Sequence, residues 1–407
     1  MTSIVLIGTF DTKGIELDYL RRKIADQGLQ VCSIDVGVMG SPQTPVDVEA
    51  RTVAAAAEAR LEDLRTNSVR SAAIETMARG ATEIISERHR QTPVQAIIAL
   101  GGSGGTTICS AAMRALPFGI PKLLISTVAS GQVSGYVGTS DIMMYYSVAD
   151  LAGLNHLTAR VLENAAAAIV GMAKGAEYSV RQRSSRPVIA VTMFGVTSSG
   201  AEVAREWLEC HGYEVIVFHA NGSGGRAMEQ LVRERQIDGV LDFTTTELAD
   251  EIVGGTLSAG PERLEIAGAL GVPQVVSLGA MDVVNFGARG TVPDKFENEL
   301  FVEHNANVTL MRTPRRFSGL IGKTLANKLN KSRGPTAVFV PGAGFSALSA
   351  KGEPFADPDS DAALVKALAD ALAPSITVVR SPANINDPEF ARSMANTLDQ
   401  FMKERGT

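Results

Sequence analysis

Two glycine-rich turns in the first half of the chain carry residue types that proteins use to hold an anion. One is GGSGGTT at residues 101–107, and the other is GTFDTKG at residues 8–14; each follows an apolar run and precedes a helical pattern. Unpaired amide groups and the positive end of the helix dipole attract anions at such a turn, and glycine lets the backbone approach closely. The alternative is a merely tight strand-to-helix turn, for which one or two glycines suffice. The predicted phosphate-binding residues of the 101–107 turn are Gly101, Gly102, Ser103, Gly104, Gly105, Thr106 and Thr107.

The turn at residues 8–14 offers the charge that the 101–107 turn lacks. No lysine follows the 101–107 turn, so the usual P-loop pattern is absent. Lys13 is therefore expected to pair with phosphate oxygens, and Asp11 to hold Mg²⁺ directly or through water. A helix N-cap is the other interpretation of Asp11. The candidate binding residues of this turn are Gly8, Thr9, Asp11, Thr12 and Lys13.

Two further positions in the first half are candidates for the same ligand. Asp35 ends the second predicted strand, where doubly wound folds contact a ribose hydroxyl; a plain turn residue is an equal alternative. A long hydroxyl-rich loop at residues 126–141 follows the fourth predicted strand. Long polar loops inside compact domains are usually functional, so this loop is expected to cover the ligand, with Asp141 as a second acidic group.

The second half has polar residues where successive predicted strands end. His219 or His304 is a candidate general base, and Glu247 or Asp282 would orient it. Arg226 and Arg312 suit a carboxylate or phosphate, and a further anion-binding turn is predicted at residues 341–346. No pair has the spacing of a zinc site on a helix, and an ordinary hydrogen-bonded role is the alternative for either histidine. The candidate catalytic set is His219, Glu247, Asp282, His304 and Arg312.

Alternating apolar runs and alanine-rich helical stretches must position these residues. In the first half strands are predicted at residues 4–8, 31–36, 94–100 and 122–127, with helices between them. In the second half they are predicted at residues 188–194, 215–219, 239–243, 274–278, 308–311, 337–340 and 376–379, with a closing helix at 388–403. Apolar strands separated by helices indicate α/β, doubly wound parallel sheets. We therefore predict two Rossmann-like domains, 1–183 and 187–407, joined by the polar segment 181–187, with the ligand crevice between them.

The bulk composition narrows the class of protein. The chain has 407 residues, a net charge of −6 and no block of Lys and Arg, which argues against nucleic acid as a partner. No signal-peptide pattern follows Met1, and no apolar run approaches the roughly 20 residues of a membrane span. Three widely spaced cysteines fit a reducing compartment. A cytoplasmic protein without membrane contact is expected, and the composition does not decide between a monomer and a homodimer.

Three segments together resemble the family named for the tomato mosaic virus resistance protein. They are GTFDTK, GGSGGTT and STVASG…YVGTSDI, supported by HANGSGGRAME in the second half, and the resemblance covers nearly the whole chain. It implies two Rossmann-like subdomains and an N-terminal region that binds ATP. The residues implied for ATP are Thr9, Asp11, Thr12, Lys13 and the 101–107 turn, and more weakly Asp35 and Thr127.

The expected function is that of a Mg²⁺-ATP-binding α/β protein with a second-domain site for a small acidic ligand. It would act as an ATP-dependent enzyme or hydrolase on a small acid. The alternative is a nucleotide-dependent conformational switch without turnover. A dinucleotide oxidoreductase is disfavoured because G-x-G-x-x-G does not follow the first strand.

Overall fold

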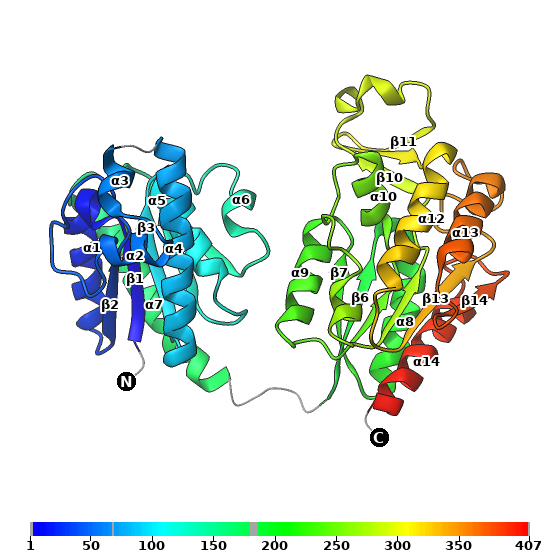
Figure 1. Cartoon of the computed structure of the whole chain (residues 1–407), viewed down its shortest axis with the longest axis horizontal. Coiled ribbons are helices and arrows are strands. Elements are labelled where there is room, and N and C mark those ends of the chain that lie inside the picture. The colour runs from blue at the N-terminus through cyan, green and yellow to red at the C-terminus, as the bar shows by residue number, and fades with distance from the viewer. Residues whose placement is uncertain (1–2, 67–68, 180–185, 406–407) are drawn as a thin grey trace. The chain divides into compact units, whose positions relative to one another are not determined.

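The computed structural model describes residues 3–66, 69–179 and 186–405. The chain divides into two compact units, Met1–Arg183 and Ser184–Thr407 (Figure 1). Most of the predicted linker at residues 181–187 lies outside the described residues.

The first unit is built on a five-stranded parallel sheet in the order β2-β1-β3-β4-β5. This is the flavodoxin-like doubly wound order, in which the chain leaves the adjacent strands β1 and β3 in opposite directions. Ligands bind in such sheets outside the carboxyl ends of these two strands. The strands are β1 (Ser3–Gly8), β2 (Gln30–Asp35), β3 (Ala96–Gly101), β4 (Lys122–Ser126) and β5 (Ile142–Tyr146).

Helices cover both faces of this sheet because its strands are apolar on both sides. In β1, Ile4 and Leu6 pack toward α1 and α7, whereas Val5 and Ile7 pack toward α2, α4 and α5. No helix in the described ranges of the whole chain is long and apolar enough to span a membrane. The helices of the first unit are α1 (Phe10–Ala25), α2 (Ala50–Ala56), α3 (Leu61–Thr66), α4 (Arg70–Gln91), α5 (Ser103–Arg114), α6 (Ser134–Val137) and α7 (His156–Ser179).

The second unit repeats the plan with one more strand. Its parallel sheet has the order β14-β13-β9-β8-β6-β7, so β6, β7 and β8 correspond to β1, β2 and β3. The predicted doubly wound α/β fold is confirmed in both units. The strands are β6 (Val188–Met193), β7 (Glu214–His219), β8 (Gly239–Asp242), β9 (Gln274–Ser277), β13 (Thr336–Pro341) and β14 (Thr377–Ser381). The helices are α8 (Ser198–Cys210), α9 (Ser223–Arg233), α10 (Thr246–Val253), α11 (Ile266–Ala269), α12 (Arg315–Leu329), α13 (Pro358–Ala371) and α14 (Pro388–Arg405).

One predicted strand lies in a different sheet from the one expected. The apolar run at residues 308–311 forms β12 (Val308–Arg312), which pairs antiparallel with β10 (Val283–Phe286) and β11 (Phe301–Asn305) in a separate three-stranded sheet. The end of β12 therefore does not lie at the edge where the parallel strands of the larger sheet end. The other predicted strands are present with ends shifted by at most two residues, whereas β5, β10 and β11 were not predicted.

Candidate functional site

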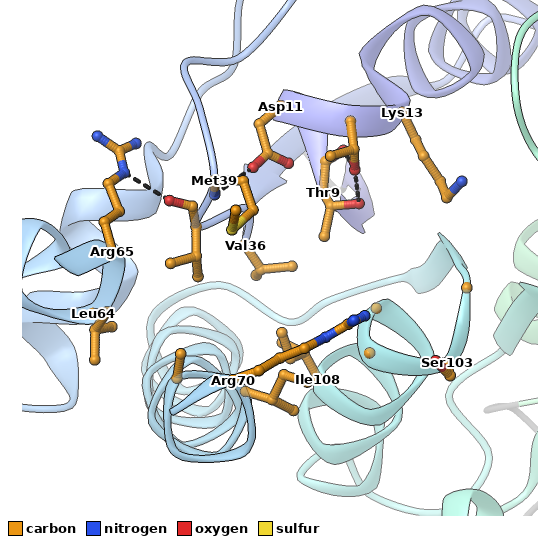
Figure 2. A pocket seen from close by; sticks show the side chains of 17 residues that line it. Thr9, Asp11, Lys13, Val36, Met39, Leu64, Arg65, Arg70, Ser103 and Ile108 are labelled. Carbon is orange, nitrogen blue, oxygen red and sulfur yellow. Dashed lines mark hydrogen bonds between the residues drawn. The ribbon is translucent and has the colours of Figure 1, made fainter. Parts of the chain in front are cut away.

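A cavity of about 630 Å³ opens in the first unit where the chain leaves β1 and β3 (Figure 2). The loops after β1, β2 and β3 and the start of α4 all contribute to its wall, so the two glycine-rich turns do converge on one cavity. A Cβ built on Gly105 would lie 3.9 Å from Cγ2 of Thr9, which shows how closely the turns approach. The polar or glycine lining residues are Thr9, Asp11, Thr12, Lys13, Arg65, Arg70, Gly102, Ser103, Gly104 and Gly105. The apolar ones are Val36, Val38, Met39, Leu64, Ala73, Ile74 and Ile108.

The 101–107 turn is the first turn of a helix, not a loop before one. Helix α5 begins at Ser103, with Gly102 as its N-cap residue, whereas the sequence predicted a helix only after the turn. The first amide groups of a helix have no acceptor within it, and the positive end of the dipole lies beside them. The absence of side chains on Gly104 and Gly105 leaves these groups open toward the cavity. This helix start can hold an anion.

Three residues of the predicted set have roles other than facing the cavity. A Cβ on Gly101 would lie 2.7 Å from backbone atoms of the next helical turn, so close packing explains this glycine. The Thr106 hydroxyl is buried and bonds to that of Ser126 at 2.7 Å, and the Thr107 hydroxyl donates to the carbonyl of Ser103 at 3.0 Å. The predicted phosphate contacts of Gly101, Thr106 and Thr107 are therefore not supported, whereas that of Ser103 stays open.

Arg70 is a basic residue of the cavity that the sequence did not single out. It begins α4, and its Nη2 would lie 3.9 Å from a Cβ on Gly104, beside the α5 start (Figure 2). It has no hydrogen-bond or ion-pair partner among the described residues. Arg65 also lines the cavity, but its guanidinium donates to the carbonyls of Val38 and Gly40, each at 2.6 Å. Arg70 is thus the cation that is available to a ligand.

The turn after β1 is held together by its own residues. The Thr12 hydroxyl donates to that of Thr9 at 2.9 Å, and both residues line the cavity. Gly8 allows close packing, because a Cβ there would lie 2.8 Å from Cδ1 of Leu17. Lys13 lines the cavity too, but its Nζ donates to the carbonyl of Leu151 at 2.6 Å. The predicted cation is therefore at the cavity and is held by a neighbouring loop.

Asp11 braces the loop after β2 and does not cap its helix. The N-cap residue of α1 is Thr9, so the N-cap interpretation of Asp11 is wrong. Asp11 Oδ2 accepts hydrogen bonds from the amides of Met39 at 2.8 Å and Gly40 at 3.1 Å, and Oδ1 is buried against Gly37 without a partner. Among residues 3–66, 69–179 and 186–405, no group of three or more His, Cys, Asp or Glu could hold a metal. The protein residues present do not fit a metal site of their own at Asp11.

Asp35 lies beneath the cavity and supports its wall. The side chain is 1% exposed, and Oδ1 accepts from the amides of Phe10 at 2.9 Å and Gly37 at 2.8 Å. Burial raises the pKa of Asp35 to about 6, against the effect of these two amides. Asp35 does not line the cavity and instead fixes the loops after β1 and β2, so this arrangement does not support the predicted ribose contact.

The loop at residues 126–141 does not contribute lining residues to this cavity. Thr127 lies near the α5 start, where its Oγ1 would be 3.9 Å from a Cβ on Gly102, but it is not part of the wall. Asp141 accepts from the fully buried Nζ of Lys122 at 2.6 Å and from the amide of Gly119. Asp141 is therefore a structural partner of Lys122, and the prediction of a second acidic ligand group there is wrong.

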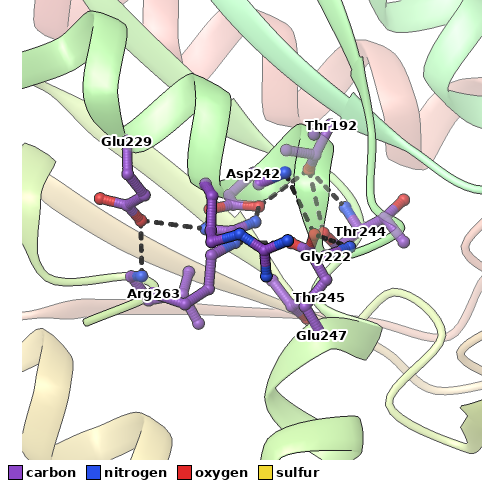
Figure 3. Close-up of polar contacts among 12 residues, drawn as sticks. Thr192, Gly222, Glu229, Asp242, Thr244, Thr245, Glu247 and Arg263 are labelled. Carbon is purple, nitrogen blue, oxygen red and sulfur yellow. Dashed lines mark hydrogen bonds and ion pairs between the residues drawn. The ribbon is translucent and has the colours of Figure 1, made fainter. Parts of the chain in front are cut away.

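In the second unit, Glu247 belongs to a buried ion cluster centred on Arg263 (Figure 3). Arg263 is 1% exposed and contacts three acids: Asp242 through two bonds of 2.5 and 2.6 Å, Glu247 at 2.7 Å and Glu229 at 3.4 Å. Burial raises the pKa of Glu229, and Arg263 opposes that change. Both oxygens of Glu247 are thus occupied, so the structure does not support its predicted role of orienting a histidine.

The glycine-rich turn before α9 is filled by the protein itself. Glu247 Oε1 accepts from the amides of Gly222 at 2.7 Å and Gly225 at 3.1 Å, and Asn221 Oδ1 accepts from that of Gly224 at 3.1 Å. An internal carboxylate therefore takes the place that an anion could take at this helix start. His219, just before this turn, is exposed and lies edge-on to Phe194 with ring centroids 5.3 Å apart.

Among the other predicted catalytic residues, Asp282 and Arg312 are neighbours, and His304 lies elsewhere. Asp282 is fully buried and accepts from the hydroxyl of Ser346 at 2.5 Å; burial raises its pKa, and Arg312 opposes this. Arg312 pairs with Asp361 at 2.5 Å, and Arg226 donates to the carbonyl of Ser258. His304 is exposed on β11, in the antiparallel sheet. The structure does not bring His219, Glu247, Asp282, His304 and Arg312 together in one site, although Asp282 and Arg312 are in contact. The catalytic roles stay predictions that this arrangement does not support.

The fold and the cavity define a two-unit, doubly wound α/β protein with a switch-point cavity in its first unit. Residues 2–178 match the N-terminal domain, and residues 186–402 the C-terminal domain, of the Uncharacterised protein family (UPF0261). The chain belongs to this family.

Relatives of the chain include bacterial and plant proteins. A UPF0261 protein of Clostridium tetani is 46% identical over 98% of this chain and 99% of its own length. The ToMV resistance protein Tm-1(GCR237) of Solanum lycopersicum is 42% identical over 82% of this chain, which is 45% of the plant protein. The predicted relationship to the tomato mosaic virus resistance protein is thereby confirmed. A solved UDP-N-acetylglucosamine 2-epimerase from Rickettsia bellii aligns over 99% of this chain and 98% of its own, but its 10% identity and TM-score of 0.23 carry no argument.

Proposed function

We propose that the first unit binds ATP in the cavity between the β1 and β3 turns. The observation that supports this is one cavity whose lining combines a helix start and a cation with apolar side chains. The start of α5 and Arg70 can hold phosphates, and Val36, Met39 and Leu64 are among the apolar lining residues. A nucleotide has the same division into phosphates and an apolar base. A volume of about 630 Å³ also lies within the range of about 300–1,000 Å³ that is typical of ligand pockets.

The phosphates would lie at the α5 start. Amide groups of the first helical turn, the hydroxyl of Ser103 and the guanidinium of Arg70 are the donors there. Lys13 would join them by exchanging the Leu151 carbonyl for a phosphate oxygen, which is the stronger acceptor because it carries charge. Thr9 and Thr12 would face the ligand from the opposite turn.

Magnesium would enter with the nucleotide. Mg²⁺ keeps several waters and is commonly held by substrate phosphates with one or two carboxylates. Asp11 is the acidic residue on the cavity wall, and its Oδ2 is already engaged with two amides. The ion would therefore rest mainly on phosphate oxygens and water, and Mg²⁺ should affect ATP affinity more than adenosine affinity.

The proposal is one of binding, and it leaves both an enzyme and a switch open. The predicted acid–base set of the second unit is dispersed, so it does not support hydrolysis or phosphoryl transfer to a small acid there. An ATP-dependent enzyme would consume ATP in a turnover assay. A nucleotide-dependent switch would bind ATP without net chemistry.

Replacement of Arg70 by methionine should weaken ATP binding by about 10- to 100-fold, because a charge-assisted phosphate contact contributes roughly 1.5–3 kcal/mol. Adenosine, which has no phosphate, should bind the variant within about threefold of its wild-type affinity. Calorimetric titration of the full chain with ATP and adenosine measures both. Arg79→Met is the matched control, since Arg79 is exposed on the same helix α4 but does not line the cavity. The phosphate role of Arg70 would be contradicted if Arg70→Met lost as much affinity for adenosine as for ATP, or if both variants lost the same affinity for ATP.

A further inference from the structure

A second cavity, of about 850 Å³, lies in the second unit where β13 and β14 end. Helix α13 forms its opposite wall, beginning at Pro358. Val340 and Arg380 are partners in the register of β13 and β14, so their side chains lie on the same face of the sheet. Val365 of α13 also lines the cavity and gives it an apolar part.

One wall of this cavity carries more negative than positive charge. Asp361 lines it and pairs with Arg312 at 2.5 Å, and Arg312 also donates to the backbone carbonyl of the buried Asp282. The Asp282 carboxylate itself accepts from the Ser346 hydroxyl; burial raises its pKa, and the charge of Arg312 opposes this. Asp357 lines the cavity as well. Burial raises the pKa of Asp361 to about 6, Arg312 opposes the rise and Asp282 adds to it.

Polar atoms behind this wall remain without partners. Asp282 Oδ1 and Arg312 Nε are both buried and form no hydrogen bond with the described residues. Buried polar atoms are nearly always satisfied in native proteins, so such atoms call for an explanation. These two atoms lie behind the wall, since neither Asp282 nor Arg312 lines the cavity. The acidic lining residues are Asp357 and Asp361, and they favour a cationic or hydrogen-donating group beside them.

Two basic residues also line the cavity. Lys351 and Arg380 line it, both are exposed, and neither has a hydrogen-bond or ion-pair partner within the described ranges. The backbone is not free to bind the anion, because the amides of Gly342 and Ala343 donate to the carbonyls of Ser381 and Ala383 at 2.7 and 3.1 Å. The anion-binding turn predicted at residues 341–346 is therefore not supported. An anion here must be held by side chains.

We propose that this cavity binds a small zwitterion, a molecule of the amino-acid class. Its ammonium group would lie against Asp361, its carboxylate against Arg380 and Lys351, and its carbon chain along Val340 and Val365. Complementary charge at both ends gives the site its selectivity, since a molecule with only one of the charges leaves one wall unmatched. The proposal is independent of ATP binding in the first unit.

The test uses the full chain at about neutral pH, where amino acids are zwitterions. Glycine, alanine, 4-aminobutyrate and 6-aminohexanoate are titrated and followed by saturation-transfer NMR and calorimetry, with butyrate and butylamine as singly charged probes. At least one zwitterion should bind at millimolar concentration or below, at least about 10-fold more tightly than either singly charged probe. Asp361→Asn and Arg380→Gln should each weaken it by about 10-fold or more.

Lys366→Gln is the matched control, because Lys366 lies on α13, pairs with Asp370 and does not line the cavity. Arg380 is exposed, so Arg380→Gln keeps the test valid even if Asp361→Asn fails to fold. The proposal is overturned if none of the zwitterions binds, if butyrate or butylamine binds as well as the best zwitterion, or if the control loses as much affinity as the two site variants.

Discussion

Replacement of Gly104 by valine should weaken ATP binding by at least about 100-fold, which corresponds to about 2.7 kcal/mol. Gly104 lies in the first turn of α5, on the cavity wall between the helix start and Arg70. A Cβ there would be 3.2 Å from Cδ1 of Ile74, the end of a flexible side chain, so the fold can adjust. The larger valine side chain would fill the space that the phosphates need. Calorimetry with ATP, together with thermal unfolding, separates loss of binding from loss of structure.

Gly171→Val is the control for Gly104→Val. Gly171 lies within helix α7, and a Cβ there would meet no atom within 4 Å. This variant should bind ATP as the wild type does. A folded Gly104→Val protein with unchanged ATP affinity would contradict the proposal that the phosphates bind at the start of α5.

Replacement of Arg263 by methionine should destabilise the second unit by about 3–5 kcal/mol, because it leaves buried carboxylates without their cation. Arg263 is 1% exposed and contacts Asp242, Glu229 and Glu247. The free energy of unfolding from urea titration of the full chain measures the loss. ATP binding by the first unit should stay within a few fold under native conditions.

Arg233→Met is the control for the ion cluster. Arg233 pairs with Glu262 at the surface, with side-chain exposures of 46% and 74%, and such pairs contribute roughly 0–1 kcal/mol. If Arg263→Met lowered the free energy of unfolding as little as Arg233→Met does, the three acids would not be charged in the folded protein.

The architecture could be predicted because continuous apolar runs indicate strands that are buried on both faces of a sheet. Every parallel strand of the two sheets except β5 was predicted from such runs, and the doubly wound topology followed from the helices between them. The direction in which β12 pairs could not be predicted, since a short apolar strand looks alike in parallel and antiparallel sheets. Its partners β10 and β11 are short, and β11 is largely exposed.

Of the candidate site, only the two glycine-rich turns could be predicted from the sequence. Glycines at residues 102–105 stand out in the sequence, and they do line the cavity. Arg70 does not stand out, because its place depends on how α4 packs beside α5. Asp11 and Asp35 were predicted to be binding residues. Aspartate serves as a ligand-binding residue, as a helix N-cap and as an acceptor for loop amides, so the residue type alone does not distinguish these roles. Which amides they meet is decided by the path of the loop after β2.

The second unit shows the same limit more clearly. Glu247 and Arg263 are 16 residues apart in the sequence, and nothing local indicates that they pair. Strand ends carrying His, Glu, Asp and Arg are compatible with a catalytic pocket and with a buried ion cluster. Only the tertiary contacts distinguish the two, and here they favour the cluster for Glu247.

A crystal structure of the full chain grown with a non-hydrolysable ATP analogue and Mg²⁺ tests the central claim most directly. We expect the triphosphate at the start of α5, within hydrogen-bond distance of the amides of Gly104 and Gly105 and of the Arg70 guanidinium. The base should lie on the apolar wall that includes Val36 and Leu64. A nucleotide bound elsewhere on the chain, or an empty cavity in crystals grown with millimolar analogue, would contradict the account.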